Sequence, residues 1–323
     1  MKFQFFSRAL AGLALTASAG LAGAQAYPAK PVRMIIAFPP GGPTDIVARV
    51  IAQQISMQMG QQVVVDNKPG AGGNIAAEQA ARALPDGYTI FYNTSAIVIG
   101  PALYAKVNYD TLKDYAPVVL TAAIPMVLVV NPNLPPKNVK EFIELAKAQP
   151  GKLNYGSSGT GTITHLASAM FSTQAGIQTQ HVPYKGSAPA LIDLAAGQVQ
   201  FMTDTINTGL PYIKDGRMRG LAVTSLKRSA VLPDLPTFDE SGLKGFDAAA
   251  WQGIVVPTGT PPEIITKLNA ETNRALQNAD VRAKLAAQGS DTLGSTPAEY
   301  AAYIRTEMPR WTKAVKDSGA KAE

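Results

Sequence analysis

The chain has 323 residues, of which 46% are hydrophobic, and a formal net charge of +6 at pH 7. This length and apolar content suffice for two ordinary lobes or for one large α/β domain. The chain has no cysteine, which excludes a disulfide framework and a cysteine-linked lipid anchor. Its basic residues are scattered and do not alternate with aromatic residues, so a nucleic-acid partner is not expected and an anionic ligand is weakly favoured.

The first 26 residues have the features of an export signal. Lys2 and Arg8 form a basic start, an apolar run follows from Ala9 to Leu21, and Ala24-Gln25-Ala26 is a small-x-small cleavage pattern. We therefore expect cleavage after Ala26 and a mature protein in the periplasm. No later segment is expected to cross a membrane.

The first structural unit is a strand, a glycine turn and a helix. Residues 32–38 are an almost unbroken apolar run, which predicts a strand buried on both faces. Helical spacing predicts a helix over residues 44–59, with Thr44 or Asp45 as its N-cap. The free N–H groups of a helix N-terminus can hold a carboxylate or phosphate, although a tight turn without a ligand is the simpler interpretation of one such motif. The candidate ligand-binding residues here are Pro40, Gly41, Gly42, Thr44 and Asp45.

The next units continue the alternation of strand and helix. Strands are predicted at residues 62–66 and 88–92, with a second glycine-rich loop and a helix between them. Such alternation predicts a parallel sheet with right-handed crossovers. Ligands in these folds bind at the carboxyl ends of strands. Thr94 and Ser95 follow the second of these strands, so they are candidate binding residues or simple turn formers.

The segment from Ala116 to Val130 is too long for one ordinary strand. We therefore expect it to cross between two lobes. A helix is predicted from Val139 to Ala148, and the turn Pro150-Gly151 ends it.

A second strand, glycine loop and helix begin at Leu153. The loop lacks the lysine of a phosphate-binding loop, the third glycine of a dinucleotide loop, and the last glycine of a nucleophile elbow. Anion binding at the helix N-terminus remains, with a flexible polar loop as the alternative. His165 lies in the first turn of the helix, where capping or packing is an equal alternative to ligand binding. The candidates are Ser157, Ser158, Gly159, Thr160, Gly161, Thr162 and His165.

A third candidate region follows residue 181. Tyr184 and Lys185 precede a helix predicted at 188–196, with Ser187 as its cap. A strand at 199–202 should deliver Asp204 to the cleft. A carboxylate beside a bound carboxylate needs a cation, which Lys185 or a ligand ammonium group could supply.

The last part of the chain contains a predicted strand at 220–225, a turn-rich segment at 233–245 and a return crossing at 251–257. Two helices should finish it, each announced by a capping-box pattern that starts at Thr260 or Thr296. The second helix carries a long apolar stripe, which indicates a docking face.

The sequence gives little support for a metal site or a cofactor, because it has two histidines, no cysteine and no paired carboxylate cluster. Ser157, His165 and Asp204 could form a triad on paper, although the nucleophile elbow is absent. A periplasmic serine hydrolase using the loop from Gly156 to Gly159 is therefore the alternative function.

Several motifs together resemble the Bug-type solute-binding proteins of tripartite tricarboxylate transporters. The resemblance covers nearly the whole mature chain and rests on Phe38-Pro39-Pro40-Gly41-Gly42, Asn67-Lys68-Pro69-Gly70-Ala71-Gly72-Gly73, Pro85-Asp86-Gly87-Tyr88-Thr89, Pro101-Ala102-Leu103-Tyr104, Tyr155-Gly156-Ser157-Ser158-Gly159, Val182-Pro183-Tyr184-Lys185-Gly186 and Gly259-Thr260-Pro261. One departure is Thr203-Asp204 in place of the family's frequent Phe-Asp, which would change the wall of the ligand pocket.

The resemblance implies an α/β fold of the two-lobed, type II flytrap kind, with a mostly parallel sheet in each lobe. Residues 1–26 would be the signal peptide, 27–126 and 249–323 the first lobe, and 127–248 the second. The protein would capture a small mono- or dicarboxylate, or an amino acid, and deliver it to a membrane permease. We expect a monomer. The effector domain of a transcription factor is a third interpretation, which the export signal and the lack of a DNA-binding helix pair oppose.

Overall fold

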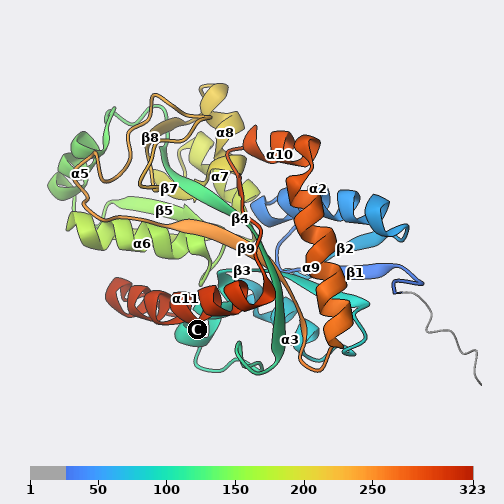
Figure 1. The fold of residues 1–323 in the computed structure, drawn as a ribbon. Helices are drawn as coiled ribbons and strands as arrows, with labels where there is room; N and C mark the ends of the chain where they lie inside the picture. Colours follow the sequence, from blue (N-terminus) through green and yellow to red (C-terminus); the bar gives the residue numbers. More distant parts are fainter. Residues whose placement is uncertain (1–26, 323) are drawn as a thin grey trace, which may run out of the picture.

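A computed structural model describes residues 27–322 of the chain. The expected export signal and its cleavage site lie outside these residues. Within them, ten strands form one continuous sheet in the order β2-β1-β3-β9-β4-β7-β5-β6, with β8 and β10 paired to β4. Helices cover both faces of this sheet (Figure 1). No helix in the same range is long and apolar enough to span a membrane.

The first lobe is built on three parallel strands, β1 (Val32–Ile36), β2 (Val63–Asn67) and β3 (Thr89–Thr94). The predicted strand in 32–38 is confirmed, and all but one of the side chains of β1 are buried. Helices α2 (Pro43–Met59) and α3 (Asn74–Ala81) make the crossovers. Helix α4 (Ala96–Leu103) was not predicted, because Gly100 and Pro101 disfavour a helix and its buried surface shows no polar face.

Two strands connect the lobes. Strand β4 (Tyr115–Val130) pairs with β9 (Ala249–Pro257) up to Pro125, and with β7 and β8 from Met126 onward. Both crossing strands run through the middle of the molecule (Figure 1). They add antiparallel pairs to the parallel strands of each lobe, so the whole sheet is mixed. We propose that the lobes comprise residues 27–126 with 249–323, and 127–248, because β4 changes partners between these two groups.

The second lobe has the same plan as the first. Strand β5 (Leu153–Ser157) lies between its parallel neighbours β6 (Thr179–Pro183) and β7 (Phe201–Thr205). β6 was not predicted, since it is a half-exposed edge strand with few apolar residues. Helices α5 and α6 cover one face, and α7 and α8 cover the other. The remaining elements of this lobe are α5 (Val139–Ala148), α6 (Ile163–Ala175), α7 (Ser187–Ala196), α8 (Ile206–Lys214) and β8 (Arg219–Val223).

Several predicted helix starts are wrong. The N-cap of α2 is Gly42 and that of α7 is Gly186, so Thr44, Asp45 and Ser187 lie inside the first turn. The reason in α2 is Pro43, whose fixed φ suits the first helical position. Residue Thr162 does cap α6, through a hydrogen bond from the His165 N–H.

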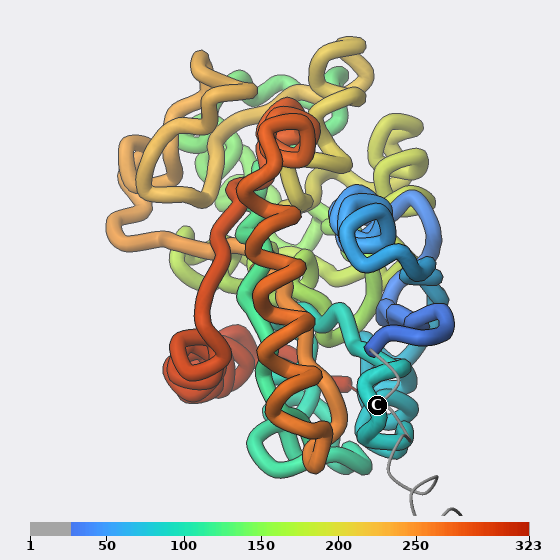
Figure 2. The backbone as a smooth tube through the Cα atoms, turned by 45° about the vertical axis from the view of Figure 1, so that its right-hand side comes forward, coloured from blue at the N-terminus to red at the C-terminus, as the bar shows by residue number. Residues whose placement is uncertain are grey.

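The C-terminal segment completes the first lobe with three helices instead of the two predicted. α9 (Pro262–Gln277) and α10 (Ala279–Ala286) pack with α2 on one face of the sheet, and α11 (Pro297–Ser318) packs with α3 and α4 on the other. Figure 2 shows α9 running alongside the crossing strand β4, which it contacts. The capping box at Thr296 is confirmed, whereas α9 has no side-chain cap. The short strand β10 (Asp291–Thr292) joins the last two helices.

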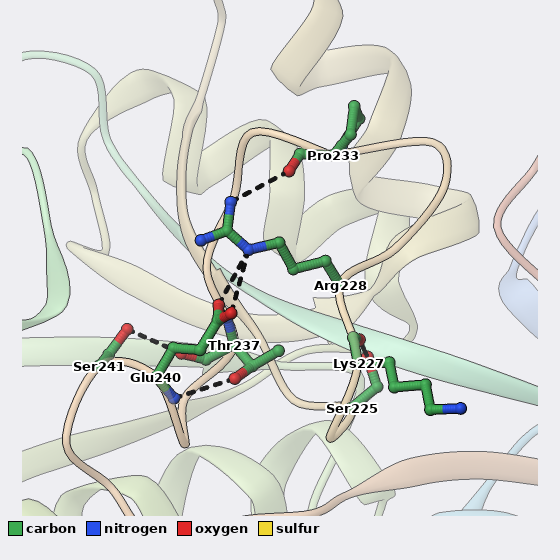
Figure 3. A network of polar contacts seen from close by, with 7 residues as sticks. All are labelled: Ser225, Lys227, Arg228, Pro233, Thr237, Glu240 and Ser241. Atoms are coloured by element: carbon green, nitrogen blue, oxygen red, sulfur yellow. Dashed lines mark hydrogen bonds and ion pairs between the residues drawn. The ribbon is translucent and has the colours of Figure 1, made fainter.

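The turn-rich segment between β8 and β9 is held by a local polar network (Figure 3). Glu240 accepts hydrogen bonds from Arg228 Nε at 2.9 Å and from the Thr237 N–H at 2.8 Å. The Glu240 N–H in turn donates to Thr237 Oγ1 at 3.0 Å. These bonds replace the regular backbone ladder that this segment lacks. Water and salt screen this exposed ion pair, so it adds little to stability.

Candidate functional site

A cavity lies between the two lobes, and its atom-free space, counted together with its opening to solvent, is about 620 Å3. The N-terminal ends of α2 and α4 reach it from the first lobe, and those of α6 and α7 reach it from the second. Strand β9 contributes to its wall. The lining residues are Phe38, Pro39, Pro40, Gly42, Pro43, Thr44, Thr94, Ser95, Ala96, Ser158, Thr162, Ile163, Thr164, Lys185, Gly186, Ser187, Ala188, Pro189, Ala250 and Gln252.

The electrostatic character of the cavity is positive. Lys185 is the only charged residue among those that line it, and no lining residue is acidic. The first N–H groups of a helix have no partner within the helix and carry a partial positive charge. Four such helix ends therefore face one cavity. The arrangement favours an anion, and a carboxylate can accept hydrogen bonds from such helix ends.

Eight of the residues predicted from sequence line this cavity. A second, more open space adjoins it, of about 1120 Å3 when its opening to solvent is counted, and three further predicted residues line it: Gly159, Thr160 and Tyr184. Lys185 lines both spaces. The eight in the first cavity are Pro40, Gly42, Thr44, Thr94, Ser95, Ser158, Thr162 and Lys185.

Asp45 does not line the cavity, nor does Gly41. The buried Asp45 carboxylate accepts hydrogen bonds from Gly41 N–H at 2.9 Å, from Arg49 and from Asn67 Nδ2 at 3.0 Å. Burial alone would raise the pKa of Asp45, but the hydrogen bonds from Arg49, Gly41 and Asn67 outweigh it and lower the pKa. Asp45 thus fixes the shape of the first glycine turn, and the Gly41 N–H is already satisfied.

Asp204 is also placed away from the cavity, in contrast to the prediction. Its side chain is fully buried in β7 and accepts hydrogen bonds from Ser187 Oγ at 3.0 Å and from Thr208 Oγ1 at 2.6 Å. Burial raises the pKa of Asp204 to about 6. The strand continues past the predicted end at residue 202, and this places Asp204 within it. Asp204 therefore positions Ser187, which lines the cavity, and has no ligand-facing role here.

The serine and histidine residues of the second loop form a buried cluster. Ser157 Oγ and His181 Nε2 are 2.6 Å apart, and the His181 ring stacks on His165 with centroids 3.8 Å apart. His165 Nδ1 accepts a hydrogen bond from the Gly161 N–H at 3.2 Å. Burial lowers the pKa of His165 to about 4, and burial together with the His165 charge lowers that of His181 to about 3. Both rings are neutral and support the loop from behind.

This cluster does not have the geometry of a hydrolase. The expected partner of Ser157 was His165, yet Ser157 bonds to His181, and Asp204 belongs to a separate network. Ser157 is fully buried and lines neither space. A base with a pKa near 3 also has little capacity to take a proton from a serine hydroxyl. Among residues 27–322, no group of three or more histidine or acidic side chains is placed to hold a metal ion.

Gly161 has a different role from the one predicted. Its φ is +79°, and a Cβ atom there would lie 2.6 Å from Leu103 and 3.0 Å from Tyr104, both in the first lobe. Close by, Tyr104 Oη donates to the Thr160 carbonyl at 3.1 Å. Glycine at 161 thus lets the two lobes approach each other, and does not itself contact the cavity.

Sequence reasoning missed several lining residues. Ile163 and Thr164 follow a correctly predicted helix start, so the first turn of α6 could have been included. Gly186 to Pro189 form the start of α7, whose predicted N-cap was one residue late. Ala250 and Gln252 lie in β9 and carry no local signal, because only the folding of the sheet brings this strand to the cavity.

Known proteins match almost the whole chain. The family model of the tripartite tricarboxylate transporter family receptor matches residues 47–320. The protein BugT of Bordetella pertussis is 38% identical over 310 residues, which cover 94% of this chain and 95% of BugT. The chain belongs to this receptor family. The family is one of periplasmic binding receptors.

Solved structures of similar proteins agree with this family. The R. palustris protein Rpa4515, solved with adipate, is 38% identical, with a TM-score of 0.88 and coverage of 91% of this chain and 99% of that one. MatC from Rhodopseudomonas palustris, solved with bound malate, is 34% identical, with a TM-score of 0.85 and coverage of 90% and 100%. The expected two-lobed α/β fold is confirmed. The protein is a solute-binding receptor and not an enzyme, so the serine hydrolase alternative is set aside.

Proposed function

We propose that this receptor captures a small carboxylate between its lobes and presents it to the membrane permease of its transporter. The observation that carries the proposal is the cavity itself, with four helix N-termini, one lysine and no acidic lining residue. The adipate and malate bound by similar proteins support the same class of ligand. A monomer, exported and cleaved after Ala26, is part of the proposal.

The proposed contacts are strong enough for useful binding. A hydrogen bond to a charged group contributes about 1.5–3 kcal/mol. Four or five such bonds from helix N–H groups and hydroxyls would therefore outweigh ordering costs and reach about −8 kcal/mol, the free energy of micromolar binding. The hydroxyls of Thr44 and Ser95 line the cavity from the first lobe, whereas the Thr162 hydroxyl is already bonded to Gly159 and to the start of α6.

Thermal denaturation against a panel of ligands tests the proposal. Mono- and dicarboxylates should raise the melting temperature by mass action, and the corresponding uncharged amides should not. The variant Lys185→Gln should weaken the response to every active carboxylate, whereas Lys137→Gln, far from the cavity at the exposed start of α5, should behave as wild type. A protein stabilised equally by carboxylates and amides would contradict the proposal.

A further inference from the structure

Two hydrogen bonds join the lobes away from the crossing strands. Tyr104 Oη of the first lobe donates to the Thr160 carbonyl of the second at 3.1 Å. Asn207 Nδ2 of the second lobe donates to the Pro43 carbonyl of the first at 3.2 Å. The other interlobe hydrogen bonds among residues 27–322 lie along the crossing strands or just before β9.

The two bonds lie on opposite faces of the sheet. Tyr104 directly follows α4 and Thr160 precedes α6, and both helices pack on the same face as α11. Asn207 lies in the first turn of α8, and Pro43 begins α2, which packs with α9 and α10 on the other face. Each bond therefore ties the start of a helix that reaches the cavity to the opposite lobe.

The glycine-rich loop at residues 67–73 fits closely around the first bond. Gly72 has a φ of +62°, and a Cβ atom there would lie 2.8 Å from the Thr160 carbonyl oxygen and 2.9 Å from Tyr104 Oη. Any side chain at this position would therefore displace both partners of the bond. Part of the loop lines the second space, but none of it lines the cavity. Its role is thus the contact between the lobes.

Neither donor is placed to touch a ligand in the cavity. Tyr104 lines only the second space, and Asn207 lines neither space. Both acceptors are backbone carbonyls, so the bonds do not depend on the identity of a ligand. Water replaces the partners when the lobes separate. A neutral hydrogen bond of this kind should therefore favour the closed protein, with its lobes in contact, about fivefold over the open protein, which is about 1 kcal/mol.

We propose that Tyr104 and Asn207 are positioning residues that hold the lobes together whichever ligand occupies the cavity. The two bonds share no partner, so together they raise the ratio of closed to open protein about 25-fold. The apparent affinity for a ligand is the affinity of the closed protein multiplied by the closed fraction. Both residues therefore raise the affinity for every ligand by one common factor and do not select among ligands. This effect on affinity rests on the proposed function, whereas the closing of the lobes does not.

Single-molecule fluorescence tests the inference on protein freed of bound compounds by unfolding and refolding. The chain has no cysteine, so dyes can be attached at Met57→Cys on α2 and Ile192→Cys on α7, two exposed positions in different lobes. Tyr104→Phe and Asn207→Ala should each lower the closed-to-open ratio about fivefold, and the double variant should lower it about 25-fold. A double variant with the wild-type ratio would overturn the inference.

Matched controls separate this role from a general loss of stability. Tyr115 Oη donates to the Ala77 carbonyl at 2.6 Å, and Asn131 Nδ2 donates to the Leu194 carbonyl at 2.8 Å, each within one lobe. Tyr115→Phe and Asn131→Ala should lower the melting temperature and keep the wild-type ratio of closed to open protein. Controls that shift this ratio as far as the interlobe variants do would overturn the inference.

Calorimetry with adipate, malate and succinate gives a second test. Tyr104→Phe and Asn207→Ala should weaken the binding of every probe that wild type binds, each by one common factor of at most about fivefold. A loss confined to one probe would indicate direct contact with that ligand and would overturn the inference. Wild-type protein that binds none of the probes, but whose variants show the expected fluorescence shift, would contradict the proposed function and leave this inference standing.

Discussion

Acid should destabilise this protein through the stacked histidines behind the second glycine loop. Burial holds the pKa of His165 at about 4, and burial with the His165 charge holds that of His181 at about 3. In the unfolded chain both pKa values return to about 6.5. Because the folded-state values are depressed, the unfolded chain takes up protons first. The stability from the neutral pair is complete above pH 6.5 and is lost as the pH falls toward the folded-state values.

The size of the effect follows from these values. At pH 5 both histidines are still neutral in the folded protein, because their folded-state pKa values lie below this pH. In the unfolded chain each is protonated, and the gap of 1.5 pH units between 6.5 and 5 lowers the free energy of unfolding by about 2 kcal/mol per histidine, or about 4 kcal/mol for both. Asp204 acts in the opposite direction, because burial raises its pKa to about 6 and protonation favours the folded state. That gain is about 1 kcal/mol at pH 5. The free energy of unfolding should therefore fall by about 3 kcal/mol between pH 7.5 and pH 5.

Urea unfolding at the two pH values measures this loss, with the fluorescence of the buried Trp251 and Trp311 as the probe. The double variant His165→Gln, His181→Gln should lose none of its stability at pH 5, whatever its stability at pH 7.5. Each single variant should recover about 2 kcal/mol of the net loss of about 3 kcal/mol. A double variant as acid-sensitive as wild type would refute the assignment of neutral, buried rings.

Three further predictions follow from the same structure. Gly161→Ala should weaken ligand binding about tenfold, since its Cβ meets Leu103 across the closed lobes. Gly151→Ala, also at positive φ but in open space, should keep the wild-type affinity and lose only the cost of backbone strain, about 1–2 kcal/mol of the free energy of unfolding; equal affinities in the two variants would contradict this. Asp204→Asn should change ligand affinity by less than about fivefold, as measured by calorimetry. Between pH 7.5 and pH 5 its free energy of unfolding, measured with urea, should fall by about 1 kcal/mol more than that of wild type, because only the aspartate is stabilised by protonation in the folded state. Intact-mass analysis of a periplasmic extract should show a mature chain that begins directly after Ala26, and a mature chain retaining the basic start would disprove the expected processing.

Local patterns in the sequence predict much of the fold. The apolar run of β1, the length of β4 and the helix from Val139 to Ala148 were all visible, because each depends on residues close together in the chain. The missed helices have identifiable causes. α4 is apolar on nearly all sides and contains Pro101, so it shows no amphipathic pattern. α8 is short and contains Gly209 and Pro211, both of which disfavour a helix.

The candidate site was predictable only in part. Glycine loops at helix N-termini mark the right region, since strand ends and helix starts converge at one edge of each lobe. Side-chain direction was not predictable: Asp45 and Asp204 turn toward local donors, and Ser157 turns toward His181, which showed no partner in the sequence. Gln252 reaches the cavity only through the pairing of β9 with β3 and β4, and residues far apart in the chain determine that pairing.

The central claim is that the cavity holds a small carboxylate, and mass spectrometry of the compound released from purified, denatured protein tests it most directly. The protein is taken from periplasm without exchange into carboxylate buffers, and Gly161→Ala is prepared in parallel as a binding-impaired control. We expect one small carboxylic acid in near-equimolar amount from wild type and much less of it from the variant. Stoichiometric release of a sugar, an amine or another compound without a carboxyl group would contradict the account.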